Sequence, residues 1–270
     1  MRVRCWLKRC VGALLMGVPL MLCAQAWPNK PIRWIIPYPP GGITDGATRM
    51  VVQKITEQTG WTIVVDNKPG ANSILGADLA ARSPADGYTF LTVIGAHAAN
   101  ATLYAGRLPY DVVKSFSPVS LVGIAPLVMT VTNNLPAKDV KELIAYAKAN
   151  PGKLSFGSSG VGAAAHLTQE LFKQVAGVDM IHVPYKGTAP ALTTMVEAGG
   201  PPIEGSTWVL FLAPAATPKD IVNRLSAETA KAIQSPDIKA KFEALGIEAV
   251  GNSPEQAAKF LDDEIVKWGK

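Results

Sequence analysis

A strand that runs into a glycine-rich turn and opens a helix is the feature that most constrains this chain. The apolar run 32–36 predicts a buried strand, and Pro39-Pro40 ends it because proline cannot donate to a sheet ladder. Gly41-Gly42 allow a tight turn, and we expect Thr44 to cap the helix that follows. The first turn of such a helix offers unpaired N–H groups and a positive dipole end, which suit an anion.

The same arrangement recurs later in the chain. Residues 154–156 predict a short strand, 157–162 a glycine–serine turn, and 163–176 a helix that Gly177 ends. Two such turns, one in each of two lobes, could hold two acidic ends of one small molecule between them. Apart from Arg49 neither turn carries an arginine, so recognition would rest on backbone donors, which suits a solute that must be released.

The first 26 residues predict a secretory signal peptide. A basic start precedes the apolar run 11–22, and Ala24-Gln25-Ala26 forms a small-x-small site with cleavage expected after Ala26. The apolar run is too short to span a bilayer, which needs roughly 20 apolar residues. Cys23 raises the alternative of a lipoprotein, but the bulky Leu22 before it argues against lipidation. We therefore expect a secreted protein.

Removal of this segment changes what composition implies. All three cysteines precede residue 27, so the remainder has no disulfide, no cysteine nucleophile and no cysteine metal site. Four of the 26 basic residues lie there and no acidic one, so the remainder is nearly neutral. There is no basic stripe, and we predict no nucleic-acid role, no metal and no cofactor.

Strands and helices alternate through the rest of the chain, which predicts an α/β fold with parallel βαβ units. Beyond those above, strands are expected at 61–65, 88–94, 119–123, 127–131, 180–183 and 207–212, and helices at 73–82 and 138–150. Three further helices each open with a hydroxyl residue and a proline, at Thr217-Pro218, Ser235-Pro236 and Ser253-Pro254. Ser253 with Gln256 also fits a capping box. This C-terminal part carries no evident chemistry.

A loop of small residues at 95–100 follows the strand expected at 88–94, and we expect it beside the first turn, because ligands of open α/β sheets sit beyond the carboxyl ends of strands. Ala96 is a candidate contact there. His97 is either a ligand contact or a local hydrogen-bond partner, the second being favoured. We expect His166 to cap or line the second turn and His182 to be a satisfied core residue. Tyr185 and Lys186 could line the cleft, although Lys186 is equally a solvated surface residue.

Tests for catalysis fail. The turn at Ser158-Ser159 departs from the nucleophile elbow Gly-x-Ser-x-Gly, because Val161 stands at the second glycine. His166 could in principle activate a hydroxyl, but no orienting acid is evident, so a Ser/His hydrolase is only a distant alternative. There is no phosphate-loop lysine motif and no His-x-x-x-His metal pair. We predict that the protein is not an enzyme.

Five short motifs follow one another along the chain. They are Pro37-Tyr38-Pro39-Pro40-Gly41-Gly42-x-x-Asp45, Ala85-Asp86-Gly87-Tyr88-Thr89, Ser155-Phe156-Gly157-Ser158-Ser159-Gly160-x-Gly162, His182-Val183-Pro184-Tyr185-Lys186-Gly187 and Leu212-Ala213-Pro214-Ala215-x-Thr217-Pro218. In these motifs the chain resembles the periplasmic solute-binding proteins of the tripartite tricarboxylate transporter family, the Bug proteins. The resemblance covers nearly all of residues 27–270.

The resemblance implies a two-lobed type II periplasmic binding protein that closes on a carboxylate-bearing solute and delivers it to a membrane permease. It implies that both turns grip carboxylates through backbone N–H groups and bound waters. Asp45 is itself negative, so we assign it to orienting the loop or a water. The candidate ligand-binding residues are Tyr38, Pro40, Gly41, Gly42, Asp45, Ala96, Ser158, Ser159, Gly160, His166 and Tyr185.

One departure from the family pattern stands out. A block of some dozens of residues, including a central strand, is expected to be missing after Thr193. We therefore predict one lobe from 27–125 and 206–270, and a shortened, incomplete second lobe from 126–205. Binding would then be impaired, or the chain would be a non-functional relic. A secreted sensor or accessory protein of the same fold is a further alternative. We expect a monomer, and the sequence does not indicate which carboxylate is bound.

Overall fold

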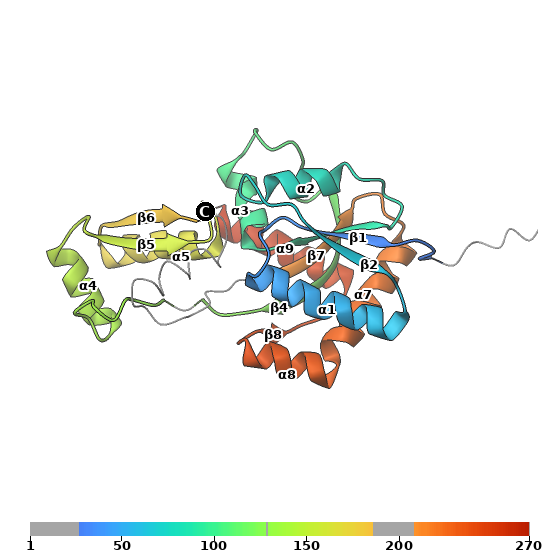
Figure 1. The fold of residues 1–270 in the computed structure, drawn as a ribbon. Coiled ribbons are helices and arrows are strands. Elements are labelled where there is room, and N and C mark those ends of the chain that lie inside the picture. The colour runs from blue at the N-terminus through green and yellow to red at the C-terminus, as the bar shows by residue number, and fades with distance from the viewer. Residues whose placement is uncertain (1–26, 128, 186–207, 270) are drawn as a thin grey trace, which may run out of the picture.

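The computed structural model describes residues 27–127, 129–185 and 208–269. The predicted signal peptide, Lys186 and the junction expected after Thr193 lie outside these residues. The described elements form two lobes, a large one around a six-stranded sheet and a small one around a two-stranded sheet (Figure 1). The residue boundaries that we predict for the lobes stay a prediction.

The large lobe is organised around a mixed sheet with the strand order β2-β1-β3-β7-β4-β8. β1 pairs in parallel with both β2 and β3, as the alternation of elements predicts. β7 pairs antiparallel with β3 and with β4, and β8 antiparallel with β4, so the expectation of parallel units holds only for the first half of the sheet. The strands are β1 (Ile32–Ile36), β2 (Ile63–Asn67), β3 (Thr89–Val93), β4 (Phe116–Ile124), β7 (Val209–Pro214) and β8 (Glu248–Ala249).

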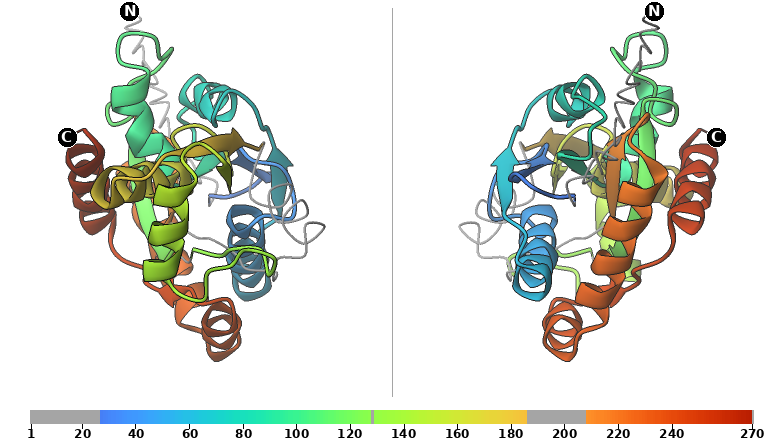
Figure 2. Two further views of the ribbon diagram at one scale, coloured as in Figure 1. Left: turned by 90° about the vertical axis from the view of Figure 1, so that its left-hand side faces the viewer. Right: turned by 90° about the vertical axis from the view of Figure 1, so that its right-hand side faces the viewer.

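Helices cover both faces of this sheet (Figure 2). α1 (Ile43–Thr59), α7 (Lys219–Gln234) and α8 (Pro236–Ala244) pack on one face. α2 (Ile74–Ala81), α3 (Gly95–Leu103) and α9 (Pro254–Trp268) pack on the other. Successive side chains of β1 point to opposite faces, so Trp34 and Ile36 join the first cluster and Ile35 the second. None of the described helices is long and apolar enough to cross a membrane.

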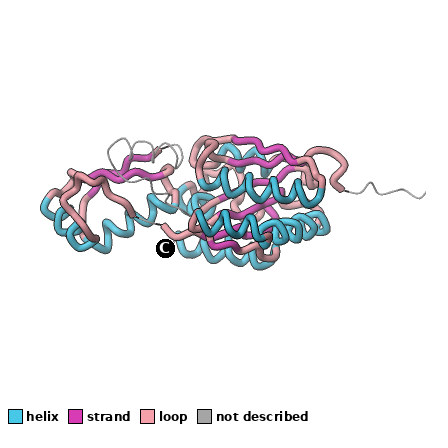
Figure 3. Tube along the Cα trace, turned by 60° about the horizontal axis from the view of Figure 1, so that its bottom comes forward, coloured by secondary structure: helices cyan, strands magenta, loops and turns pink. Residues whose placement is uncertain are grey.

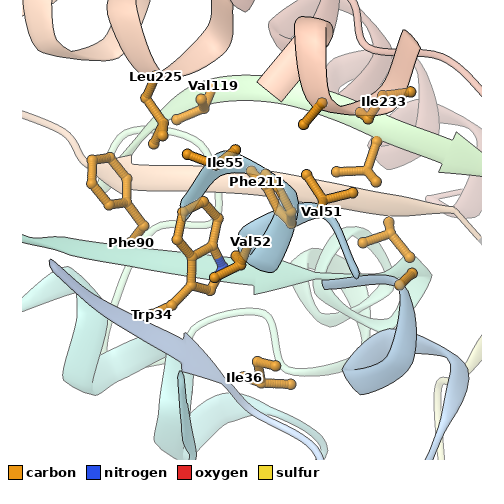
Figure 4. Packing of buried hydrophobic residues seen from close by; sticks show 14 of the residues in the cluster. Trp34, Ile36, Val51, Val52, Ile55, Phe90, Val119, Phe211, Leu225 and Ile233 are labelled. Atoms are coloured by element: carbon orange, nitrogen blue, oxygen red, sulfur yellow. The ribbon is translucent and has the colours of Figure 1, made fainter. Parts of the chain in front are cut away.

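Trp34 occupies the centre of the first cluster (Figure 4). Its ring has no exposed surface and lies 4.5 Å from the ring of Phe211 and 5.4 Å from that of Phe90, centroid to centroid. Its indole N–H donates to the Thr92 hydroxyl at 2.9 Å, which satisfies the one polar group that the ring buries. This residue therefore ties β1 to β3 and β7.

The small lobe consists of the parallel pair β5 (Leu154–Ser158) and β6 (Met180–Pro184) with α4 (Val140–Ala149) and α5 (Ala164–Ala176) (Figure 3). Its cluster of buried apolar residues is Ala147, Phe156, Val178 and Met180. α4 begins at Asp139, whose side chain accepts from the N–H of Glu142 at 2.8 Å. α5 ends at Gly177, as predicted, and this glycine has a φ of 61°.

Several local expectations are corrected by the structure. Residues 95–100 are not a loop but the first part of α3, and residues 127 and 129–131 form no strand. Thr44 lies inside α1, whose N-cap is Gly42. α7 begins after Pro218 rather than at a Thr217 cap. The capping box of Ser253 and Gln256 is confirmed.

We expect Trp34→Ala to be severely destabilising, because it removes a fully buried ring and leaves the Thr92 hydroxyl without this donor. The free energy of unfolding should fall by about 3–5 kcal/mol, measured by urea denaturation. Leu171→Ala, at a half-exposed position on α5, is the control and should change it by less than about 0.5 kcal/mol. A small effect of Trp34→Ala would contradict the central position of this ring.

Candidate functional site

The first turn is held in shape by the carboxylate of Asp45, which is buried. Its Oδ2 accepts from the N–H of Gly41 at 3.1 Å, and its Oδ1 accepts from Arg49 Nε and from Asn67 Nδ2, both at 2.9 Å. Gly41 has a φ of 88°, which favours glycine. Asp45 thus orients the loop, which is the role expected for it. Hydrogen bonds from neighbouring groups of the protein stabilise its negative charge.

Among the described residues, no side-chain cap forms at the beginning of α1. Its N-cap is Gly42, in an extended conformation, and no heavy atom lies within 4 Å of where a Cβ would stand there. Helix geometry leaves the N–H groups of Ile43 and Thr44 without an intrahelical acceptor. This helix end can therefore accept an anion, although the N–H of Gly41 is already engaged by Asp45.

Asp45 remains ionised at neutral pH. Burial alone would raise the pKa of its carboxyl group, but hydrogen bonds from Arg49, Asn67 and Gly41 outweigh that effect and hold the pKa below its usual value. The charge of Arg49 acts in the same direction. The negative charge is thus neutralised locally and leaves the positive end of α1 available.

Tyr38 points into the large lobe. Its ring packs against the first cluster, and its backbone carbonyl accepts from Asn67 Nδ2 at 3.0 Å. Burial raises the pKa of the Tyr38 phenol, which the Ser73 hydroxyl beside it offsets only in part. Pro40, in contrast, is exposed. The predicted contact of Tyr38 with a solute would therefore have to involve its backbone rather than its buried hydroxyl.

The second turn is held in shape by Ser158, which is buried at the end of β5. Its hydroxyl donates to the carbonyl of Gly160 at 3.1 Å and accepts from the N–H of Gly160 at 3.2 Å. His182 Nε2 lies 2.6 Å from the same hydroxyl, within hydrogen-bond distance, and the tautomer of His182 decides which of the two groups donates. Ser158 thus shapes the turn from inside. Ser159 is half-buried, and its hydroxyl has no hydrogen-bond partner among the described residues.

Two histidines stack beneath this turn with ring centroids 4.0 Å apart. Nδ1 of His166 accepts from the N–H of Gly162 at 3.0 Å, so His166 caps the turn as predicted and carries its proton on Nε2. Burial lowers the pKa of both His166 and His182, and proximity to His166 lowers that of His182 further. Both rings are therefore neutral at pH 7, and the positive character of the turn comes from the uncapped start of α5.

The side chains at the start of α3 are enclosed within the large lobe. Ala96 and His97 have no exposed surface. Nε2 of His97 lies 3.0 Å from the Val112 carbonyl, and its ring stacks on Tyr110. Of the two alternatives for His97, the local hydrogen-bond partner is confirmed. The Ala96 methyl group is enclosed, so a contact with a solute would come from its backbone at the start of α3.

The structure brings the second turn against residues of the large lobe that the sequence did not indicate. A Cβ placed on Gly162 would stand 3.0 Å from Asn72 Nδ2, and one placed on Gly160 would stand 3.6 Å from Asn72 Oδ1 and 3.5 Å from the carbonyl oxygen of Tyr185. Tyr185 also donates its N–H to the carbonyl of Ser158 at 2.9 Å. α1 and α5 both begin on the side where the lobes meet (Figure 1). That residues 41–45 and 158–160 hold one solute stays a prediction.

The geometry does not support catalysis by Ser158. The Ser158 hydroxyl lies 2.6 Å from His182 Nε2, but it is buried and forms hydrogen bonds with both polar backbone atoms of Gly160 within its own turn. Among the described residues no group of three or more His, Cys, Asp or Glu side chains could hold a metal ion. That backbone donors on the two lobes form the site stays a prediction.

This fold defines a class: it is the α/β fold of periplasmic binding proteins. A solved structure described as a periplasmic transporter superimposes with a TM-score of 0.85 and 32% identity, over 90% of this chain and 96% of that one. R. palustris Rpa4515, solved with adipate, matches with a TM-score of 0.82 and 31% identity over the same shares.

The family is equally clear. The model of the tripartite tricarboxylate transporter family receptor, TctC, matches residues 47–197 and 189–270. BugT of Bordetella pertussis is 31% identical over 93% of this chain and 91% of its own length. The chain belongs to this family of solute-binding receptors, which are not enzymes.

The comparisons also bear on the expected deletion. The family model matches in two stretches that overlap at residues 189–197, next to the predicted junction after Thr193. The alignment with BugT extends over 301 positions, more than the 270 residues of the whole chain. Relatives therefore carry residues that this chain lacks, and the break in the match places their loss near the predicted point.

Asp45→Asn should lower the free energy of unfolding at pH 7 by about 1–3 kcal/mol, because the amide cannot accept from all three donors. The folded pKa of Asp45 lies below the unfolded value of 3.8, so its contribution is complete above that value and is lost as the pH falls through the folded pKa. Chemical denaturation between pH 7 and pH 3 should show the gap between variant and wild type closing in acid. Asp86→Asn, at an exposed pair with Lys30, is the control and should change little at any pH.

His97→Gln tests the buried imidazole. Burial lowers the pKa of His97 from 6.5 to about 4. Between these two pH values the imidazole is protonated in the unfolded chain but not in the folded one. The wild type should lose about 3 kcal/mol of stability from this residue as the pH falls from 6.5 to 4, and the variant should not. Glutamine keeps a donor for the Val112 carbonyl. Denaturation curves whose separation is the same at pH 7 and pH 4.5 would show that His97 titrates normally.

Proposed function

We propose that the protein captures a small carboxylate-bearing solute between its two lobes in the periplasm and delivers it to the membrane permease of a tripartite transporter. The observation that carries this proposal is the pair of uncapped helix starts, α1 and α5, one on each lobe. Asp45 in the first turn of α1 and Ser158 in the turn before α5 are both engaged internally. Backbone N–H groups at the two helix starts, together with the Ser159 hydroxyl, are left as donors for an anion.

The solute class that we propose is a small dicarboxylic acid. Two helix starts on opposing lobes suit two negative ends, and R. palustris Rpa4515 was solved with adipate. Periplasmic location rests on the predicted signal peptide and on the family. Delivery to a permease rests on the family alone. The expectation of a monomer stays a prediction.

Residues 27–270 should show an increase in Tm with adipate but not with adipamide, its uncharged diamide. Acid at 100 times its Kd stabilises the folded chain by about 2.7 kcal/mol, which corresponds to a rise of about 5–10 °C for a chain of this size. A panel of four- to six-carbon diacids, with hexanoate as the monoacid, identifies whether both ends are recognised. No shift with any acid would favour the non-functional alternative that the deletion raises.

Substitution of Gly42 tests the site at α1. Gly42→Asp and Gly42→Asn have nearly the same shape, both are good N-caps, and no heavy atom lies within 4 Å of the Cβ position. Only aspartate adds a negative charge where the acid is expected. Isothermal titration should show adipate binding at least about tenfold weaker in Gly42→Asp than in Gly42→Asn, a difference of about 1.4 kcal/mol. Equal affinities would place the solute elsewhere.

A further inference from the structure

Three successive residues in the large lobe adopt a backbone conformation that side chains rarely take. Ala71, Asn72 and Ser73 have φ values of 47°, 52° and 72°. Asparagine tolerates the left-handed region better than most residues, but alanine and serine do not, so the surroundings must hold this run in place. It lies between β2 and α2, and Ser73 is the N-cap of α2.

The side chain of Asn72 is clamped by that of Asn100 on α3. Asn72 Nδ2 donates to Asn100 Oδ1 at 2.8 Å, and Asn100 Nδ2 donates to the backbone carbonyl of Asn72 at 3.0 Å. Asn100 has no exposed surface. The two residues form a reciprocal pair, here called the amide pair, that fixes the direction in which Asn72 presents its side chain.

Two glycines of the small lobe, Gly160 and Gly162, lie next to the amide pair. At Gly162 a Cβ would stand 3.0 Å from Asn72 Nδ2 and 3.9 Å from Asn100 Oδ1, and it would overlap Leu103 Cδ1. At Gly160 a Cβ would stand 3.6 Å from Asn72 Oδ1. The turn therefore approaches the large lobe with its bare backbone, at a distance that leaves no room for a side chain at position 162 unless its neighbours move.

This turn is rigid, because Ser158 bonds to both polar backbone atoms of Gly160 and His166 caps the N–H of Gly162. Whatever fixes the turn also fixes the start of α5, which follows directly. Among the described residues, the large-lobe groups nearest to the Cβ positions of Gly160 and Gly162 are uncharged: the amides of Asn72 and Asn100 and the side chain of Leu103.

We propose that Asn72 is a positioning residue. Asn100 holds its side chain, Gly160 and Gly162 of the small lobe pack against it, and this contact sets how closely the two lobes approach. The proposal deepens the proposed function, because this spacing would fix the distance between the two helix starts that hold the solute. Asn72 acts through the turn and need not touch the solute itself.

The test compares Asn72→Gly with Ala71→Gly. Both replace a residue of positive φ by glycine, so both relieve the same backbone conformation, but only the first removes the amide. Residues 27–270 contain no cysteine, so nitroxide labels can be attached to cysteines introduced at Val64 and Val175, which are exposed on the large and small lobes. Pulsed electron paramagnetic resonance then reports the distance between the lobes without any solute.

We expect Asn72→Gly to broaden or shift the inter-label distance distribution and Ala71→Gly to leave it as in the wild type. Adipate affinity should fall about tenfold or more in Asn72→Gly alone. Equal distance distributions in the two variants would overturn the proposal. If the distance distribution changes in Asn72→Gly but the wild type binds no acid, the positioning role of Asn72 would be supported and the proposed function refuted.

A second pair of variants tests the other side of the contact. Gly162→Leu and Gly177→Leu place the same side chain at φ values of 79° and 61°, but only Gly162 faces Asn72 and Leu103, whereas nothing lies within 4 Å of a Cβ at Gly177. Only Gly162→Leu should change the distance distribution. Changes of equal size would attribute the effect to backbone strain and overturn the proposal. Far-ultraviolet circular dichroism confirms that each variant is folded.

Discussion

The large sheet depends on β7, a strand that comes late in the sequence. β7 lies in the middle of the large sheet and pairs antiparallel with β3 on one side and β4 on the other. The chain leaves the large lobe after β4 and returns as β7, and Gly123 near the end of one is paired with Val209 at the start of the other. Both connections to the small lobe thus begin from neighbouring positions of one buried sheet, which gives the small lobe a fixed base.

That base determines where the binding groups lie. β1 and β3 run parallel, so α1 and α3 both begin at the edge of the sheet where β7 begins, because β7 runs in the opposite direction. Asp45 in the first turn and Ser158 in the second are both satisfied internally, whereas the Ser159 hydroxyl has no partner among the described residues. Such pre-organisation would reduce the ordering that a solute has to induce, with backbone N–H groups and the Ser159 hydroxyl as the donors left.

Strong periodicity and strong breakers made much of this fold predictable. The amphipathic helix that became α4, the glycine that ends α5 and the capping box of Ser253 each depend on short-range pattern alone. The direction of β7 does not, because an apolar run reads the same for parallel and antiparallel pairing. The sequence does not indicate the start of α3, because Gly95 is a poor helix former and the helix is short, with mostly small side chains.

The site was less predictable than the fold, because its organising contacts join distant residues. Asp45 was assigned to the loop from its charge, which sequence can show, but the burial of the Tyr38 hydroxyl depends on the packing around it. Nothing in the residues Ala71 and Ser73 indicates a left-handed backbone conformation. The sequence therefore does not predict that Asn72 lies next to the second turn. Among the described residues the small lobe has a buried cluster of four, with Ile144, Leu154, Phe172 and Ala176 partly buried against it. A neutral contact with the large lobe through Asn72 would position this lobe without adding a charge beside the expected anion.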